Sequence, residues 1–434
     1  MPRFLSLALI LSGLLAMPAH AQDVGEIVVN DTGDTAWLLA ASALVLMMSL
    51  PGLVLLYAGR GRAKNVLSVA MQIGAVACIV SLLWIVTGYT LAFGDVTGGW
   101  VGNGRAWMLI ELTNVRIGTT IPESAFVLFQ MGFALFAAAL MIGAWAGRAR
   151  LSWVVLFCAA WSTIVYAPIA HWVWGGGWLA SEFGTLDFAG GLVVHTSAGV
   201  SALVATIIMG NRNGFPEAPM PPHAPILSMA GAALLWVGWF GFSGGSALAA
   251  TDDASTAIIN THVAAATAAL VWLLIERIGN GKTTSLGWAS GALAGLVAIT
   301  PAALYISPGA SILFGALASV VCFGALLQIR KWGIDDAAGV FAISGVGGML
   351  GTLLLGLFVS SALGGTGYAE GMTPLGQLGA QAVGIAAVAL WSAVMTAILA
   401  LGIGIVAPMR VKKKREAAGL DIATHGERGW DFEP

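Results

Sequence analysis

The sequence predicts an all-α polytopic membrane protein with eleven transmembrane helices. Of its 434 residues, 58% are hydrophobic and only 9% are charged. A soluble domain carries about 25% charged residues, so this composition cannot supply a polar surface. The 58 glycines indicate helices that approach one another closely through small residues. The net charge of −2 excludes a nucleic-acid partner that would depend on bulk positive charge.

Residues 1–21 have the pattern of a secretory signal peptide. Arg3 precedes the apolar stretch 4–17, which is too short to span a bilayer and is followed by Ala19-His20-Ala21. We expect cleavage at this point in a bacterial plasma (inner) membrane, which leaves a short extracytoplasmic segment over 22–34. An additional short transmembrane helix is the alternative.

Eleven later stretches are apolar over about 20 residues, the length that crosses the hydrocarbon of a bilayer. They form a transmembrane domain over 35–409, and residues 410–434 form a cytoplasmic tail. The predicted crossings are 35–58, 66–93, 122–147, 151–174, 187–210, 224–247, 256–276, 285–304, 308–329, 337–360 and 377–408.

The basic residues predict the orientation. With the amino terminus outside, 16 Lys and Arg residues fall on inner segments, and only Arg105 and Arg116 fall on outer ones. This bias is typical of cytoplasmic loops, so the tail is predicted to be inside. The basic run 412–415 at the start of the tail favours a contact with anionic lipid.

An internal repeat relates the fifth and tenth crossings. Residues 187–190 (DFAG) with His195 align with residues 336–339 (DAAG) with Ser344, at the same offset of eight residues. Because the copies are five crossings apart, they have opposite orientations in the membrane. The pattern therefore predicts a 5+5 inverted repeat plus an eleventh helix, with a site near the midplane. A chance match is the alternative.

Acidic residues stand at the start of both repeat segments. Asp187 is expected to cap the fifth helix, or to add negative potential beneath a cation site. Asp335 and Asp336 are expected to cap the tenth helix.

One histidine is predicted to lie deep in the membrane. His195 is about 12 Å deeper than Asp187 at 1.5 Å per residue. A polar residue in hydrocarbon marks a functional site, or it is a core histidine satisfied by the backbone.

Aromatic residues mark a candidate mouth. Phe129 and Phe133 are four residues apart on one helix, as are Phe242 and Ser246 on another, and Trp174 ends a third. Ring faces and a serine oxygen could replace part of the hydration shell of a small cation. Packing or an interfacial aromatic belt is the alternative.

Longer strings match a known family. They are Pro51-Gly52-Leu53, 64–68 (KNVLS), 168–177 (PIAHWVWGGG), 187–191 (DFAGG), 238–242 (GWFGF), 294–297 (AGLV), 419–421 (GLD) and 425–427 (HGE). On these strings the chain resembles the ammonium transporter family, the Amt, Mep and Rh proteins, and in particular the bacterial Amt type.

The resemblance implies ammonium or ammonia as the substrate, with methylammonium as an analogue. It implies that Phe129, Trp174 and Ser246 recruit the ion and that Phe133 and Phe242 close the pore. His195 then lines an apolar path for ammonia, whose proton follows separately or stays outside. Asp187 shapes the site from within the protein.

The resemblance also implies partners. Family proteins are homotrimers with one pore per subunit, and their tails engage PII signalling proteins. The residues of this tail that match the family are Gly419, Leu420, Asp421, His425, Gly426 and Glu427.

The chain departs from the family pattern in the second repeat. Ser344 stands where the family has a second pore histidine, and Gly339 stands where it has an aspartate. His195 therefore lacks its usual partner, and we expect slower conduction or weaker discrimination against potassium. A tolerated change in a working channel is the alternative.

The sequence also fits a function of another class. An ammonium sensor or low-flux regulatory homologue that signals through a tail partner is the main alternative, and the 24 residues after Arg410 suit a regulatory contact. An enzyme is not expected, because His171, His195 and His262 show no HExxH spacing. The three cysteines match no metal-ligand spacing, so neither a metal nor a cofactor is expected.

Overall fold

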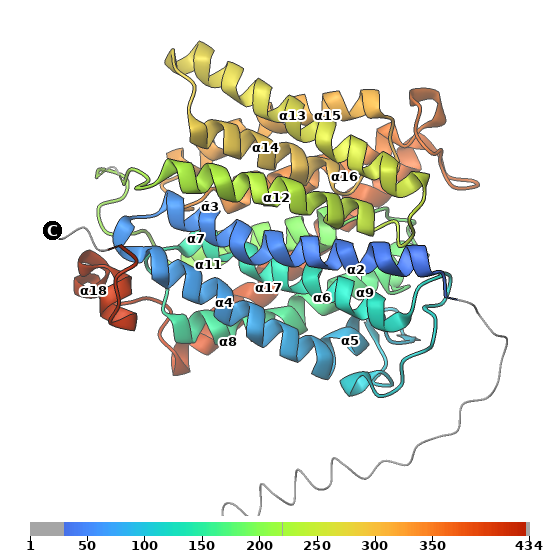
Figure 1. The fold of residues 1–434 in the computed structure, drawn as a ribbon, viewed down its shortest axis with the longest axis horizontal. Helices are drawn as coiled ribbons and strands as arrows, with labels where there is room; N and C mark the ends of the chain where they lie inside the picture. The colour runs from blue at the N-terminus through green and yellow to red at the C-terminus, as the bar shows by residue number, and fades with distance from the viewer. Residues whose placement is uncertain (1–29, 219, 431–434) are drawn as a thin grey trace, which may run out of the picture.

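Each predicted crossing contains a helical stretch in the computed structural model, which describes residues 30–218 and 220–430. Within those residues, ten stretches are long and apolar enough to cross a membrane, and Ser285–Ile299 is a shorter apolar helix beside them. The long helices run side by side in one bundle (Figure 1). The predicted all-α membrane fold is therefore confirmed. The predicted signal peptide lies outside the described residues.

The first half of the bundle contains five crossings, several of which include a π-helical turn. Their elements are α2 (Thr32–Met47), η1 (Met48–Gly52), α3 (Leu53–Arg60), η2 (Ala63–Asn65), α4 (Val66–Leu83), η3 (Trp84–Gly88), α5 (Tyr89–Phe93), α6 (Glu123–Leu140), α7 (Ile142–Trp145), α8 (Leu151–Trp161), η5 (Ser162–Tyr166), α9 (Ala167–Trp174), η6 (Gly191–Thr196) and α11 (Ser197–Met209). The connections hold the antiparallel strands β1 (Val96–Thr97) and β2 (Val101–Gly102), with η4 (Trp107–Leu109) and α10 (Trp178–Ser181).

The second half contains the remaining six crossings and the tail. Its elements are α12 (Pro225–Gly245), α13 (Asp252–Asn280), α14 (Ser285–Ile299), α15 (Pro308–Lys331), η7 (Phe341–Gly345), α16 (Val346–Phe358), η8 (Ser361–Leu363), α17 (Pro374–Val406), α18 (Lys413–Ala418) and η9 (Asp421–His425).

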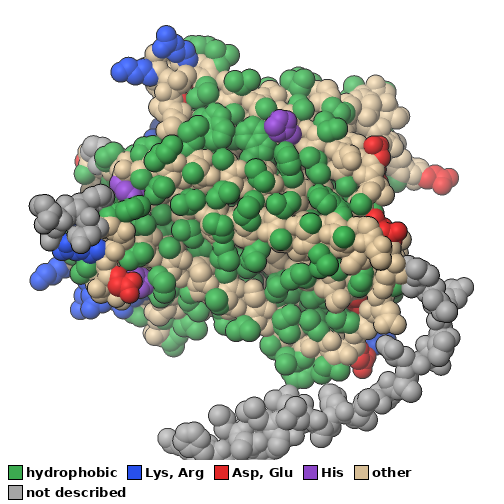
Figure 2. Space-filling model, in the orientation of Figure 1, with side chains coloured by type: hydrophobic (Ala, Val, Ile, Leu, Met, Phe, Trp, Pro, Cys, Tyr) green, Lys and Arg blue, Asp and Glu red, His purple; other side chains and the backbone are tan. Residues whose placement is uncertain are grey.

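The two ends of the bundle differ in charge. We call the end that carries α18 and η9 the tail end, and the end that carries β1 and β2 the strand end. On the face shown in Figure 2, most of the Lys and Arg side chains lie at the tail end and most of the Asp and Glu side chains lie at the strand end. Apolar side chains cover much of the surface between them, as a bilayer requires.

Capping moves the start of two helices inward from the predicted boundaries. The carboxylate of Asp187 accepts four backbone N–H groups, from residues 190 to 193, at 2.7–3.1 Å. Asp336 accepts the N–H groups of Val340 and Phe341 at 2.9 and 2.8 Å. These bonds satisfy the unpaired donors of a helix start, so the predicted capping by both residues is confirmed.

The inverted repeat is visible in the backbone at these starts. Gly190 and Gly339 have φ angles of 113° and 73°, a left-handed conformation that favours glycine. Each is followed within two residues by a π-helical segment, η6 or η7, whose second-to-last residue is His195 or Ser344. The two candidate site positions are therefore structurally equivalent. π-Helical turns inside helices occur frequently at functional sites.

The two repeat segments also cross in direct contact. A Cβ on Gly199, at the start of α11, would lie 2.3 Å from the Cα of Gly345. Only glycine allows so close an approach of two helix backbones. The segments that carry the two site positions therefore lie against one another in the middle of the bundle.

The predicted capping role of Asp335 is wrong. Its carboxylate accepts hydrogen bonds from Nε and Nη2 of Arg212 at 2.8 and 2.6 Å, and Nη1 of Arg148 lies 3.6 Å away. Burial favours the neutral acid, but the hydrogen bonds and charge of Arg212, together with the charge of Arg148, hold the pKa of Asp335 below its usual value. Burial lowers the pKa of Arg148 to about 10, although Asp335 opposes this shift. Asp335 thus ties together loops at the tail end.

The tail packs on the loop before α4. Asp421 accepts the N–H of Ser68 at 2.8 Å, and the N–H of Leu420 donates to Oδ1 of Asn65 at 2.9 Å. Nearer the bundle, Nη2 of Arg410 contacts Oε2 of Glu416 at 2.8 Å. The tail residues 419–421 are therefore bound to the start of the second crossing.

Candidate functional site

A cavity of about 820 Å³ lies at the strand end, and we call it the strand-side cavity. Three of the predicted site residues, Phe133, Trp174 and Ser246, line it. The other lining residues are Phe93, Arg116, Ile117, Thr119, Phe126, Gln130, Val173, Phe188 and Leu248. Residues from distant parts of the sequence thus form one aromatic pocket.

The polar atoms of Trp174 and Ser246 are held by the backbone. Nε1 of Trp174 donates to the carbonyl oxygen of Asp187 at 2.7 Å, so the residue that caps η6 also orients this ring. The hydroxyl of Ser246 donates to the carbonyl oxygen of Phe242 at 2.9 Å. Because that proton is used, the lone pairs of Ser246 Oγ stay available as an acceptor.

The floor of the strand-side cavity is an aromatic stack. The rings of Phe133 and Phe242 are parallel within 12°, with centroids 4.0 Å apart, and Trp174 meets Phe133 edge-on at 5.8 Å. Phe129 is fully buried and packs against Phe133 at 4.9 Å. The structure places Phe129 behind the cavity wall, whereas the sequence suggested that it would be on that wall.

His195 lies beneath this stack, among other rings. It is fully buried, and its ring is parallel to that of Trp239 within 6°, with centroids 5.4 Å apart. The ring of Phe136 packs against the rings of His195, Trp239 and Phe242, with centroid distances of 6.3, 5.7 and 5.6 Å. We call Phe133, Phe136, Phe242, Trp239 and His195 the ring layer.

Both imidazole nitrogens of His195 are buried and have no hydrogen-bond partner in the part of the chain that the structure describes. Leaving one buried polar atom unpaired costs about 1–3 kcal/mol, so native proteins seldom do so without a functional reason. The alternative expectation, a histidine satisfied by the backbone, is wrong. A polar molecule that reached this ring would therefore not have to displace a hydrogen bond from the described protein.

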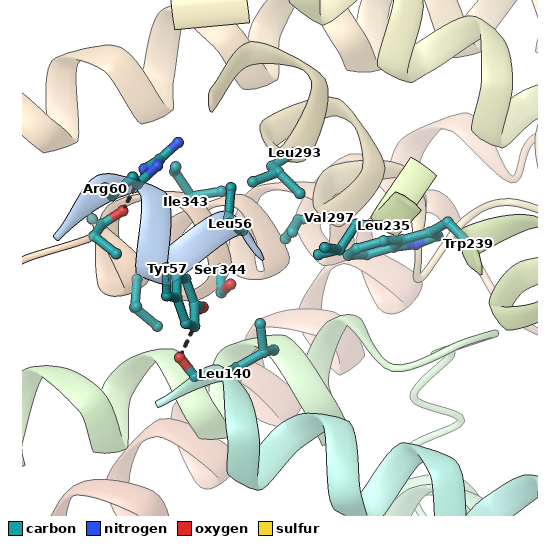
Figure 3. Close-up of a pocket in the computed structure, with 13 residues that line it drawn as sticks. Leu56, Tyr57, Arg60, Leu140, Leu235, Trp239, Leu293, Val297, Ile343 and Ser344 are labelled. Carbon is teal, nitrogen blue, oxygen red and sulfur yellow. Dashed lines mark hydrogen bonds between the residues drawn. The ribbon is translucent and has the colours of Figure 1, made fainter. Parts of the chain in front are cut away.

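A second cavity lies on the other side of the ring layer, and we call it the tail-side cavity. The space between its lining atoms is about 360 Å³, and Trp239 and Ser344 both line it (Figure 3). Tyr57 donates its hydroxyl to the carbonyl oxygen of Leu140 at 3.0 Å on this wall. The two cavities share no lining residue. Trp239 and Phe133 connect them through the ring layer.

Several residues of this arrangement were missed from the sequence. Phe136 has the helical spacing of an ordinary core residue, and its sequence position carried no signal. Trp239 lies in the family string 238–242, but no role was assigned to it. Gln130 lines the strand-side cavity, and its Oε1 is buried without a partner. Arg116 lines the same cavity, but its charge is compensated by Glu123 at 3.2 Å.

Comparison with known proteins shows the family to which this chain belongs. The family model described as Ammonium Transporter Family matches residues 36–430. The chain belongs to the ammonium transporter family. It is therefore a transporter or channel protein and not an enzyme.

Individual relatives of this ammonium transporter family member are similar to it in sequence or structure over nearly its whole length. An ammonium transporter of Aquifex aeolicus is 43% identical over 406 residues, which cover 93% of this chain and 94% of the relative. The crystal structure of Saccharomyces cerevisiae Mep2 matches with a TM-score of 0.82 and 33% identity, covering 92% of this chain and 96% of that one. A structure described as a sensor Amt protein matches with a TM-score of 0.85 and 30% identity, covering 91% and 98%.

Proposed function

We propose that this protein moves ammonium nitrogen across the bacterial plasma membrane, by gathering NH₄⁺ in the strand-side cavity and passing NH₃ through the ring layer. One observation carries the proposal. An aromatic cavity is separated from a second cavity by the buried ring layer, and among the five residues of that layer only His195 has ring nitrogens without a hydrogen-bond partner in the described structure.

The strand-side cavity has the chemistry to hold a small cation. The faces of Phe133 and Trp174 attract a cation by about 0.5–2 kcal/mol per ring, depending on how far it is desolvated. Ser246 Oγ supplies a hydrogen-bond acceptor. In this proposal Phe129 supports the recruiting ring of Phe133 from behind.

The ring layer selects the neutral form. A bare cation in an apolar layer loses its hydration and gains little in return, whereas ammonia carries no net charge. Separation of the stacked rings of Phe133 and Phe242 would admit a molecule of this size. An unpaired nitrogen of His195 then accepts from or donates to ammonia during passage. If the proton released from ammonium crosses the membrane by a separate route, the transport moves net charge. If that proton stays outside, it does not.

A sensor is the second candidate function. Two observations favour it: the similarity to a structure described as a sensor Amt protein, and a serine at the position equivalent to His195. In this reading the strand-side cavity binds ammonium, little ammonia crosses, and the tail transmits the signal to a partner.

Orientation and partners follow from charge and family membership. We propose that the tail end is cytoplasmic, because basic side chains gather there. The basic run 412–415 then faces anionic lipid. A homotrimer, and a PII protein bound to the tail over 419–427, are proposed from the family alone. Cross-linking in native membranes tests the trimer.

Uptake of labelled methylammonium by liposomes that contain the purified protein tests the transport function. We expect saturable uptake that unlabelled ammonium inhibits. Trp174→Leu should raise the half-saturation concentration about fivefold, because one ring face is lost. Trp332→Leu is the matched control, because Trp332 is 63% exposed at the tail end. Ammonium binding without any flux would overturn the transport proposal and favour the sensor.

A further inference from the structure

Arg60 ends α3 and reaches the wall of the tail-side cavity, as Figure 3 shows. Its Nη1 donates to the carbonyl oxygen of Ala338 at 2.9 Å, and its Nη2 donates to Ser290 Oγ at 2.8 Å. Its Nε is buried and has no hydrogen-bond partner among residues 30–218 and 220–430. Both partners are neutral oxygens, so they hold the guanidinium in place without cancelling its charge.

Acidic residues near Arg60 do not pair with it. Asp336 interacts electrostatically with Arg60 but forms no ion pair with it. The carboxylate of Asp336 accepts the N–H groups of Val340 and Phe341 and lines a different cavity. Asp335 in that same cavity pairs with Arg148 and Arg212. Among the described residues that line the tail-side cavity, Arg60 is the only one with a fixed charge.

The rest of this wall is apolar apart from the hydroxyls of Tyr57 and Ser344. The 360 Å³ is all the space between the lining atoms, and only roughly one water fits within it, so a cation inside it cannot keep a hydration shell. In such surroundings a unit charge acts strongly over several ångströms. Gly339 and Ser344 line the cavity and supply neither a carboxylate nor an imidazole to offset the charge.

We propose that Arg60 is a selectivity residue that keeps cations out of the tail-side cavity, so that only neutral ammonia leaves the ring layer at this end. This inference rests on the proposed transport function. A cation that passed the ring layer, or one that entered from the tail end, would meet the positive charge of Arg60 on the wall of the tail-side cavity, where no described lining residue carries a negative charge. Ammonia has no net charge and meets no such barrier.

The test compares two fluxes into liposomes that contain the purified protein: labelled methylammonium and radioactive rubidium, a potassium substitute. We expect the unmodified protein to take up methylammonium and exclude rubidium. Arg60→Met should raise rubidium uptake at least about tenfold, because a unit charge is lost from a low-dielectric wall, and should change methylammonium uptake by less than about twofold. Arg60→Lys should keep the exclusion.

Two controls separate charge from packing. Ser290→Ala removes a hydrogen bond but leaves the charge of Arg60 in place, so rubidium should stay excluded. Arg62→Met removes a neighbouring charge that contacts the tail at Ala417 O and does not line the cavity, so it should also leave rubidium excluded. If Arg60→Met does not fold, Arg60→Gln replaces it in the same comparison.

The outcomes are distinct. The role of Arg60 would be overturned if Arg60→Met excluded rubidium as well as the unmodified protein does while it still took up methylammonium. Equal leakage by Ser290→Ala and Arg60→Met would do the same, since packing would then explain the leak. Absence of methylammonium uptake by the unmodified protein would instead overturn the proposed transport function.

Discussion

Gly199 and Gly348 occupy equivalent positions in the two repeats, and each packs against the site segment of the other repeat. Each stands twelve residues after the aspartate that caps its segment. A Cβ on Gly348 would lie 2.6 Å from the carbonyl oxygen of Gly191 and 2.9 Å from Cβ of His195. The backbone crossing therefore fixes the position of His195 from the opposite repeat.

Gly348→Ala should displace the segment that carries His195. Overpacking of this kind costs about 1–3 kcal/mol, and uptake of methylammonium should fall with it. Gly402→Ala is the matched control, because no atom lies within 4 Å of the added Cβ. It should leave stability unchanged or raise it slightly. Thermal unfolding in detergent and initial uptake rates measure both effects. Equal behaviour of the two variants would contradict the crossing as the determinant of His195.

Ser344→His should restore a second imidazole at the equivalent repeat position. Ser344 lines the tail-side cavity, so a larger side chain at this position would extend into that cavity. A hydrogen bond to an unpaired nitrogen of His195 is worth about 0.5–1.5 kcal/mol, so methylammonium uptake should rise by about twofold to tenfold, or discrimination against potassium should tighten. Ser344→Ala, which offers no partner, should do neither. No change in either quantity for Ser344→His would refute the prediction.

Asp335→Asn should destabilise the protein in a pH-dependent way. The pKa of Asp335 is lower in the folded protein, so its ionised form stabilises the fold above its unfolded pKa of about 3.9, and this contribution disappears as the pH falls through the folded value. At about pH 7 the variant leaves Arg148 buried without its acid, which costs about 3–5 kcal/mol.

Thermal unfolding of the Asp335→Asn variant and the unmodified protein, compared from about pH 7 down to about pH 3, checks this sign. The difference between the two should narrow below about pH 4. Asp95→Asn is the control, since that carboxylate is 65% exposed and pairs with Arg105 only at the surface. A difference that stays constant over the whole range would show that the ion pairs do not cause the effect.

Asp421→Asn should loosen the tail from the start of α4. The charged carboxylate caps the N–H groups of Leu67 and Ser68, and loss of such a cap costs about 0.5–2 kcal/mol. Limited proteolysis with trypsin at the basic run 412–415 should become several-fold faster, because local opening exposes that segment. Glu427→Gln changes an exposed acid and should leave the cleavage rate as it was. Equal rates for both variants would count against the docked tail.

Much of the fold could be predicted from the sequence because apolar length and basic loops are local properties. The capping of the fifth and tenth helices could also be predicted, because Asp187 and Asp336 cap backbone groups that lie within six residues of them in the sequence. Asp335 could not be assigned in this way. Its partner Arg212 lies 123 residues away, and only the tertiary structure brings them together.

The site was less accessible to sequence reasoning for the same physical reason. A spacing of four puts Phe129 and Phe133 on one helix face, but it does not say which ring reaches the cavity. Arg60 has the pattern of an ordinary basic residue at a helix end. Its direction toward the tail-side cavity depends on contacts with Ala338 and Ser290, which are 278 and 230 residues away.

The ring layer also bears on the energy supply of a cell that makes this protein. A continuous chain of water molecules across a membrane conducts protons and so dissipates the proton-motive force. In the proposed function, the buried rings from Phe133 to Trp239 would interrupt such a chain of water molecules between the two cavities. Nitrogen could be imported at this site without short-circuiting the gradient that powers the rest of the cell.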